Sequence, residues 1–215
     1  MTYVSWAACY EGDKDAAYFD VLIPRVMEEI VMTRGTRHAD IAAAPAVRLR
    51  RREVDKVAHE ACAAREAFHL IFIHGDTGGR GLEVGLDQRV RAYCEAMFVR
   101  CNWPPVRCIT ISPRHETEAW ILADPQAVAA ALGYNGPPSD LGLPGTARLA
   151  EQTLDPKAVL EAAVQIVRRK RRPYDPRQIY PAIAQCHSLA NLRRAESFAA
   201  FETRLQTSLT DLGCL

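Results

Sequence analysis

The stretch His69-Leu70-Ile71-Phe72-Ile73-His74-Gly75-Asp76 decides the fold class of this chain. Its short apolar run has the length and the β-branched content of a buried parallel strand. The run stops at Asp76, and a glycine-rich loop, Thr77-Gly78-Gly79-Arg80-Gly81, follows it. Because ligands of open α/β sheets bind beyond the carboxyl ends of such strands, we expect Asp76 to lie where a metal ion or a phosphate is bound.

Strand and helix patterns alternate around this stretch. Further strands are expected at residues 3–9 and 106–111, and a short edge strand near residues 46–49 is left open. Apolar residues at helical spacing predict helices at about residues 14–33, 53–67 and 86–100, and residues 35–46 are expected to form a loop. This order predicts an α/β fold with a mostly parallel, Rossmann-like sheet flanked by helices.

A segment rich in glycine and proline, residues 133–145, separates this region from a helical tail. Asp124-Pro125 and Asp155-Pro156 each place an N-cap residue before a proline at the first helical position. Further helices are expected after Asp155 and at about residues 177–186 and 195–212. We therefore predict a domain at residues 1–135 and a helical C-terminal extension, residues 136–215, packed on it.

Composition excludes several classes of protein. Of the 215 residues 48% are hydrophobic and 25% are charged, as in an ordinary globular protein, and the formal net charge of +1 argues against a uniformly basic nucleic-acid binder. No apolar run approaches the length of a membrane span. The seven cysteines show no zinc-type spacing. We expect a soluble cytoplasmic protein without membrane association, whose cysteines are free and mostly buried.

Three acidic residues occupy matching places along the chain. Glu11 follows the first apolar run, Asp76 follows the second, and Glu118 comes shortly after the third. Carboxylates grouped at strand ends repel one another, and a divalent cation would neutralise them. Mg²⁺ needs only two or three carboxylates together with a substrate phosphate. The pattern therefore predicts a cation site.

Three blocks of the sequence resemble the TOPRIM family. Cys9-Tyr10-Glu11-Gly12-Asp13-Lys14-Asp15 is similar to the E-G-x-x-D turn that opens TOPRIM domains, and Phe72-Ile73-His74-Gly75-Asp76 is similar to their acidic strand-end motif. The block His115-Glu116-Thr117-Glu118-Ala119-Trp120-Ile121-Leu122-Ala123-Asp124 resembles the T-E-a-W-l-l-a-D block of small bacterial TOPRIM-like proteins of unknown function. Those proteins are related to RloB-type proteins and to the nuclease half of overcoming-lysogenisation-defect (OLD) nucleases. The resemblance covers residues 1–135, with a looser match in the tail.

This resemblance implies a TOPRIM-like fold with a Mg²⁺ or Mn²⁺ site that acts on the phosphodiester bonds of DNA or RNA. By motif matching, Glu11, Asp76 and Glu118 would be the catalytic residues and the metal ligands, with Glu116 as a further ligand. Proteins of this kind are paired with an ATPase in anti-phage defence systems. The resemblance therefore implies nucleic acid and an ATPase as partners, and the sequence leaves a homo-oligomer open.

The sequence departs from the family pattern at the second acidic position. That residue of the family's D-x-D motif falls at Gly78, or else His74 stands in place of the first member. Either way one carboxylate is lost, which argues against a two-metal site. Two hypotheses follow. The chain is a metal-dependent nuclease that acts as the effector subunit of a defence system, or it is a catalytically silent binding or regulatory subunit that docks on a partner ATPase.

Basic residues near these motifs are candidates for contacting the phosphates of nucleic acid. An alternative for the basic run at residues 168–172 is a charged helix end, where cations are favourable, and Arg50-Arg51-Arg52 is expected to be a solvated loop. The candidates are Arg80, Arg114, Arg168, Arg169, Lys170, Arg171 and Arg172.

Structural alternatives remain open for the acidic residues as well. Glu11 could cap the following helix, and Asp76 could be a turn residue that hydrogen-bonds its own backbone. Glu116 and Glu118 could be ordinary first-turn helix residues. His74 and His115 are expected to be hydrogen-bonded neighbours of the site rather than ligands.

Overall fold

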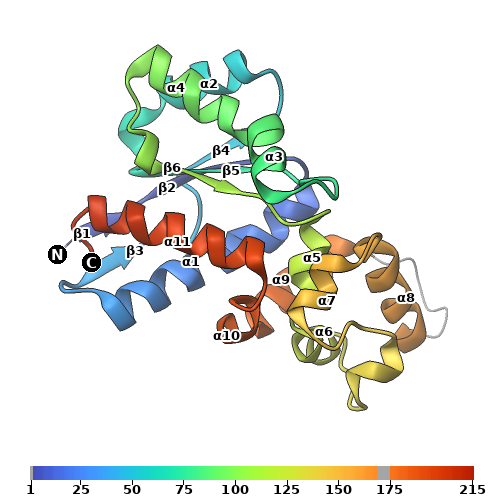
Figure 1. Ribbon diagram of the computed structural model, residues 1–215. Coiled ribbons are helices and arrows are strands. Elements are labelled where there is room, and N and C mark those ends of the chain that lie inside the picture. Colours follow the sequence, from blue (N-terminus) through green and yellow to red (C-terminus); the bar gives the residue numbers. More distant parts are fainter. Residues whose placement is uncertain (1, 169–174) are drawn as a thin grey trace.

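The computed structural model describes residues 2–168 and 175–215 and shows a sheet covered by helices on both faces (Figure 1). The strands are β1 Thr2–Val4, β2 Trp6–Tyr10, β3 Ala39–Ile41, β4 Val47–Arg50, β5 Leu70–His74 and β6 Cys108–Ile111. The helices are α1 Asp13–Arg34, α2 Val54–Ala63, α3 Leu82–Leu86, α4 Ala92–Cys101, α5 Thr117–Leu122, α6 Pro125–Ala131, α7 Ala147–Gln152, α8 Pro156–Arg168, α9 Pro176–Cys186, α10 Leu189–Leu192 and α11 Glu196–Asp211, with a π-helical turn η2 at Asp87–Arg91.

The main sheet has the strand order β4-β2-β5-β6, and β1 pairs separately with β3. Every pairing between described strands is parallel, so the carboxyl ends of all four main strands lie at one edge. From β2 the chain passes to β4 on one side and then to β5 on the other. The sheet therefore has its topological switch point beside β2 and β5, where open α/β sheets bind ligands.

Alternate side chains of the strands face two separate cores. In β2, Trp6, Ala8 and Tyr10 face the core that includes residues of α1 and α11, whereas Ala7 and Cys9 face the core that includes residues of α2 and α4. Figure 1 shows these two helix pairs on opposite sides of the sheet. Because both faces are covered, the strands are apolar at consecutive positions instead of alternating with polar residues. This explains the unbroken apolar run at residues 70–73.

Most of the expected helices and strands are found close to their predicted positions. The single strand expected at residues 3–9 is instead broken at Ser5 into β1 and β2, which belong to different sheets. The prediction of a plain loop at residues 35–46 is wrong, because β3 lies within that segment. The open edge strand is present as β4. Asp124 is the N-cap of α6, as predicted, and its Oδ1 accepts a hydrogen bond from the Ala127 N–H at 3.4 Å. No described helix is long and apolar enough to cross a membrane.

The C-terminal helices share a core with the sheet. Helix α9 packs on α1, and α11 packs on β6. The rings of Phe198 and Phe201 on α11 lie 5.0 Å and 5.5 Å from the ring of Trp120 on α5, and Phe201 lies 6.3 Å from Phe72 on β5. These contacts join the tail to the middle of the fold, while the division of the chain at residue 135 stays a prediction.

Two disulfide bonds attach α4 to its neighbours. Cys62–Cys101 joins α2 to α4, and Cys94–Cys108 joins α4 to β6. The expectation that the cysteines are free is wrong for these four residues, while the other three are free. The bonded cysteines are 39 and 14 residues apart in the sequence, and only the packing of α4 brings them together. The cysteine pattern therefore gives no support for a reducing compartment.

Candidate metal and phosphate site

An acidic pocket lies at the carboxyl edge of the sheet, where the switch point predicts it. Glu11 follows β2 directly, and Asp76 lies two residues beyond the end of β5. Together with Glu116, the residue before α5, they line a cavity of about 380 Å³. The structure therefore brings three of the four predicted acidic residues to one pocket. The rest of the described lining consists of Gly78, Arg89, His115 and Leu154.

Glu118 does not line this pocket. Its side chain is fully buried in α5, where Oε1 accepts a hydrogen bond from Tyr180 Oη at 2.6 Å and pairs with Lys14 Nζ at 2.8 Å. Its role as a metal ligand and catalytic residue stays a prediction. Its negative charge still acts on the pocket, because Glu118 is one of the groups that raise the pKa of Glu116.

Glu11 is paired with Arg51 and does not cap α1, whose N-cap Gly12 has no side-chain bond. Arg51 also donates to the carbonyl oxygens of Arg89, at 2.7 Å, and His74, at 3.3 Å. Its side chain is only 15% exposed, so the expectation of a solvated loop is wrong for Arg51. Arg51 directly follows β4 as Glu11 follows β2. If residues 46–49 are taken as an edge strand, the sequence therefore predicts Arg51 at the carboxyl edge of the sheet, beside Glu11.

A buried polar chain lies beneath the pocket. Thr117 Oγ1 donates to Asp15 Oδ1 at 2.7 Å and lies 3.2 Å from His74 Nε2. The same nitrogen is 3.2 Å from Asp76 Oδ1, although the angle does not make a hydrogen bond. Burial raises the pKa of Asp15, and His74 and the Thr117 hydroxyl oppose that rise. His74 thus lies beneath the pocket, close to Asp76, to Asp15 on α1 and to Thr117 on α5.

Two of the four candidate carboxylates are paired with cationic side chains of the chain. Glu11 is paired with Arg51, and Glu118 is paired with Lys14. Burial alone would lower the pKa of Lys14, but the hydrogen bond to Glu118 and the charges of the nearby carboxylates raise it. The pKa of Glu116 is raised first by burial, then by the charges of Glu118 and Asp76. These intramolecular pairs reduce the repulsion from which the sequence predicted a cation.

Some carboxylate oxygens nevertheless accept no hydrogen bond. In the described structure Asp76 Oδ1, Glu116 Oε2 and Glu118 Oε2 are buried and accept no hydrogen bond. Among the described residues, no three His, Cys, Asp or Glu side chains are grouped closely enough to hold an ion. Mg²⁺ commonly takes one or two carboxylates and completes its shell with water and substrate phosphate. Asp76 and Glu116 therefore fit a Mg²⁺ or Mn²⁺ ion, and Glu11 would need to leave Arg51 to join them.

The loop after β5 and the loop before α5 are hydrogen-bonded to each other at the pocket. The His115 N–H donates to Thr77 Oγ1 at 3.0 Å, and the Gly78 N–H donates to the His115 carbonyl at 3.1 Å. His115 has a φ of 65°, a left-handed conformation that is uncommon outside glycine. Gly79 has a φ of 78°, and a Cβ there would lie 2.9 Å from the His115 ring. Burial, and then the charge of Arg114, lower the pKa of His115.

The basic residues lie at different distances from the pocket. Arg89, which the sequence analysis missed, lines it from the π-helical turn η2, a distortion frequent at functional sites. A Cβ built on Gly78 would lie 3.6 Å from Arg80 Nη1 and 3.8 Å from Arg89 Nη2, so both guanidinium groups are near the glycine-rich loop. Arg114 is half-buried outside the pocket lining, and Arg168 ends α8. The candidates Arg169, Lys170, Arg171 and Arg172 lie outside the described residues.

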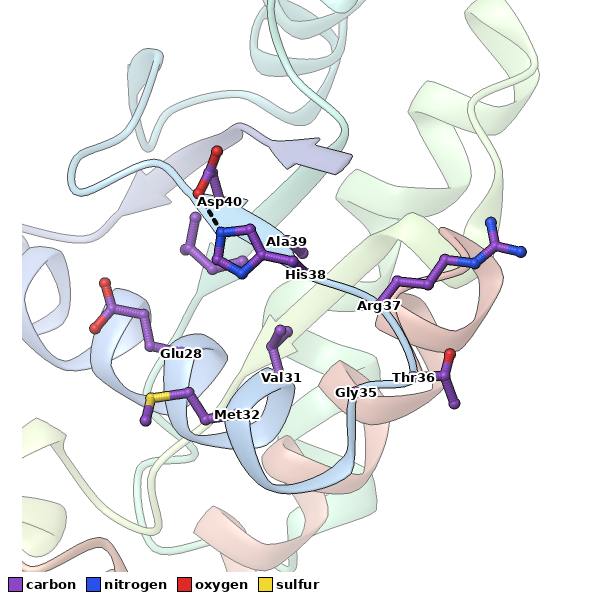
Figure 2. A pocket seen from close by; sticks show the side chains of 10 residues that line it. Glu28, Val31, Met32, Gly35, Thr36, Arg37, His38, Ala39 and Asp40 are labelled. Carbon is purple, nitrogen blue, oxygen red and sulfur yellow. Dashed lines mark ion pairs between the residues drawn. The ribbon is translucent and has the colours of Figure 1, made fainter. Parts of the chain in front are cut away.

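A larger cavity, of about 620 Å³, lies elsewhere, between the C-terminal end of α1 and β3. Figure 2 shows that its lining combines opposite charges, with His38 and Asp40 paired. Glu28 and Arg37 add one charge of each sign. The smaller acidic pocket remains the better candidate for chemistry, because it lies at the switch point and contains carboxylate oxygens that accept no hydrogen bond in the described structure.

Comparisons of the chain with known protein families, with curated proteins and with solved structures gave no match. The fold and the pocket themselves define the class. This is an α/β protein with a mostly parallel, Rossmann-like sheet, helices on both faces, and a polar pocket at the carboxyl edge.

Proposed function

We propose that this chain is a Mg²⁺- or Mn²⁺-dependent nuclease with a TOPRIM-like active site at the acidic pocket. The observation that supports the proposal is that Asp76 and Glu116 line one pocket at a sheet switch point, and that each has a buried oxygen that accepts no hydrogen bond. Burying an acceptor without a partner is unfavourable by about 1–3 kcal/mol, and more for a charged group. A bound cation would remove that penalty. The setting in phage defence, with an ATPase partner, rests on the family resemblance alone.

The residues of the pocket divide the work of binding and orientation. Asp76 and Glu116 would hold the ion, which would supply Lewis-acid activation of a phosphoryl oxygen and of water. Arg89 faces the same space and would bind a phosphate through two parallel hydrogen bonds. Arg51 binds both the carboxylate of Glu11 and the backbone carbonyl of Arg89, and so sets the distance between the acidic side chains and Arg89.

The proposal is tested with the purified chain on plasmid, linear duplex, single-stranded DNA and RNA, in Mg²⁺, Mn²⁺ or EDTA. We expect cleavage that EDTA abolishes and that Asp76→Asn or Glu116→Gln lowers by at least about 100-fold, since each removes a charged ligand. Glu66→Gln is the matched control, because Glu66 is highly exposed and does not line the pocket. It should leave the rate unchanged.

Calorimetric titration of Mn²⁺ gives a second readout that does not depend on the substrate. Wild type and Glu66→Gln should bind the ion, and Asp76→Asn should bind it at least about 10-fold more weakly. Absence of Mn²⁺ binding together with absence of cleavage would rule out the enzyme.

A second function has its own support. Glu11 and Glu118 already have cationic partners in Arg51 and Lys14, and the family's D-x-D motif has lost one carboxylate here, with Gly78 or His74 in its place. Those features suit a catalytically silent subunit that uses the same fold to dock on a partner ATPase. Such a subunit would bind no Mn²⁺, and adding the partner to the cleavage assay would produce no metal-dependent cut that Asp76→Asn removes.

A further inference from the structure

Another pocket, of about 450 Å³, lies at the opposite end of α5 from the acidic pocket and is distinct from the cavity of Figure 2; it is called the second pocket. Glu116, before the start of α5, lines the acidic pocket, and Ala123 and Asp124, just after its end, line the second one. Helix α7 runs between the same two places, because Thr146 lines the second pocket and Leu154 lines the acidic pocket. The two cavities are therefore separate, about one short helix apart.

Two arginines without partners line this second pocket. Arg148 comes from α7, and Arg194 comes from the turn before α11. Neither side chain has an ion-pair or hydrogen-bond partner within the described part of the chain. By contrast, the neighbouring Arg193 is paired with both Glu29 and Glu202. The guanidinium groups of Arg148 and Arg194 are thus left free to bind an anion.

The acidic residue of this pocket does not neutralise the two arginines. Asp124 is 2% exposed, and its Oδ2 accepts a hydrogen bond from the Ser188 N–H at 2.8 Å. Its Oδ1 accepts the Ala127 N–H, so backbone amides already hold the carboxylate. The rest of the polar lining includes the side chains of Gln126, Thr146 and Asn191, which contribute no charge. Two exposed arginines therefore line the pocket together with one buried carboxylate, whose oxygens are already bonded.

We propose that this pocket binds a phosphate-bearing small ligand of about nucleotide size. A guanidinium group presents a planar pair of donors that matches phosphate oxygens, and Arg148 and Arg194 bring two such groups to one pocket. Cavities of about 300–1,000 Å³ are the usual size for small ligands and cofactors. The amide of Gln126 offers both donors and an acceptor, which suits the edge of a base, whereas the amide of Asn191 is already bonded to Asp124. This site is independent of the proposed nuclease activity.

The test is equilibrium binding to the full chain, by calorimetry, with ATP, ADP, AMP and inorganic phosphate as separate probes. EDTA is present throughout, so that no metal ion can hold a nucleotide at the acidic pocket. We expect at least one nucleotide to bind with a Kd below 1 mM, at least 10-fold more tightly than inorganic phosphate. Arg148→Gln and Arg194→Gln should each weaken that binding at least 10-fold.

Arg50→Gln is the matched control, because Arg50 is an exposed arginine on β4 with no described side-chain partner, and it should leave binding unchanged. The far-ultraviolet circular dichroism of each variant shows that it is folded. Binding that survives both pocket substitutions, or no binding of any probe, would overturn the proposal. If inorganic phosphate binds as tightly as the nucleotides, the claim that the ligand is of nucleotide size is wrong. Binding lost in Asp76→Asn but not in Arg148→Gln would assign the nucleotide to the acidic pocket instead.

Discussion

Arg51 shows how much a single side chain organises at this site. Its guanidinium group joins Glu11 to the backbone of β5 and of η2, and it lies 5.7 Å from the centre of the Tyr93 ring. Three segments that are distant in the sequence thus meet at one residue. A buried charged group with several hydrogen bonds contributes more to stability than an exposed ion pair does.

We therefore expect Arg51→Met to lower the free energy of unfolding by about 2 kcal/mol, because it removes the hydrogen bonds to the Glu11 carboxylate and to two carbonyl oxygens. Urea denaturation followed by circular dichroism measures the change. Arg52→Met is the matched control, since Arg52 is paired with Glu60 at an exposed position, and its effect should stay below about 1 kcal/mol. Equal effects of the two substitutions would contradict the role assigned to Arg51.

Two further residues, His187 and Asp124, make stability depend on pH. Burial lowers the pKa of His187 below its usual 6.5, although Asp124 opposes the shift. Burial alone would raise the pKa of Asp124, but His187, Ser188 and Asn191 stabilise its charge and lower the pKa to about 2. His187 Nδ1 is 3.9 Å from Asp124 Oδ2, so the nearer Ser188 amide is the stronger partner.

For both groups the unfolded chain binds the proton more readily than the folded chain, so stability falls as pH falls. His187 contributes to the loss below pH 6.5, and Asp124 contributes below 3.8. We expect urea midpoints to decrease from pH 7 to pH 5, and His187→Gln to make that decrease smaller. His38→Gln, at an exposed histidine, should leave it unchanged. A decrease of the same size in His187→Gln would show that other groups cause it.

At the scale of elements, α11 is tied to the sheet through aromatic side chains. Phe201 is almost fully buried and contacts Trp120 on α5 and Phe72 on β5. The sheet therefore loses part of its cover if this contact is lost. The same helix also reaches the edge of the sheet through Arg204, which donates to the Thr110 carbonyl at 3.2 Å.

Phe201→Ala should lower the free energy of unfolding by about 3–5 kcal/mol, because it removes a buried ring and leaves a cavity. Phe98→Ala is the control, since Phe98 is 48% exposed on α4 and its loss should be about 1 kcal/mol or less. Chemical denaturation of both variants, read by tryptophan fluorescence, makes the comparison. A small effect of Phe201→Ala would mean that α11 is only loosely attached.

At the scale of the whole molecule, the two disulfide bonds restrain the half of the fold that contains α2, α4 and β6. They close loops of 39 and 14 residues. The loss of unfolded-chain entropy on closing such loops corresponds to about 3–4 kcal/mol each. The other face of the sheet, covered by α1 and α11, has no described disulfide.

We expect the denatured, unreduced chain to show three reactive thiols, from Cys9, Cys186 and Cys214, and the reduced chain to show seven. Titration with a thiol reagent in guanidinium chloride counts them. Reduction should also lower the midpoint of thermal unfolding, because the unfolded chain regains its freedom. Seven thiols before reduction would show that the bonds do not form.

Two residues of the site at the carboxyl edge could be predicted from the sequence. Glu11 and Asp76 follow strands that are apolar at consecutive positions, so their place at the edge follows from the sheet. Arg51 follows a four-residue edge strand, too short for a clear pattern. Arg89 lies on a π-helical turn, which no residue pattern marked. Glu118 lies in the first turn of α5, where its side chain contacts Lys14 and Tyr180 of α9 instead of lining the pocket.

The sequence by itself determined the α/β class, the order of the main elements and the positions of Glu11 and Asp76 after two apolar strands, because these depend on local periodicity and on the length of apolar runs. Only the tertiary structure decided which charges meet. The pairing of Glu11 with Arg51, the burial of Glu118, the two disulfide bonds and the arginine-lined second pocket all join residues that are far apart in the sequence. Such contacts depend on how the helices pack on the sheet, and local sequence patterns contain no information about that packing.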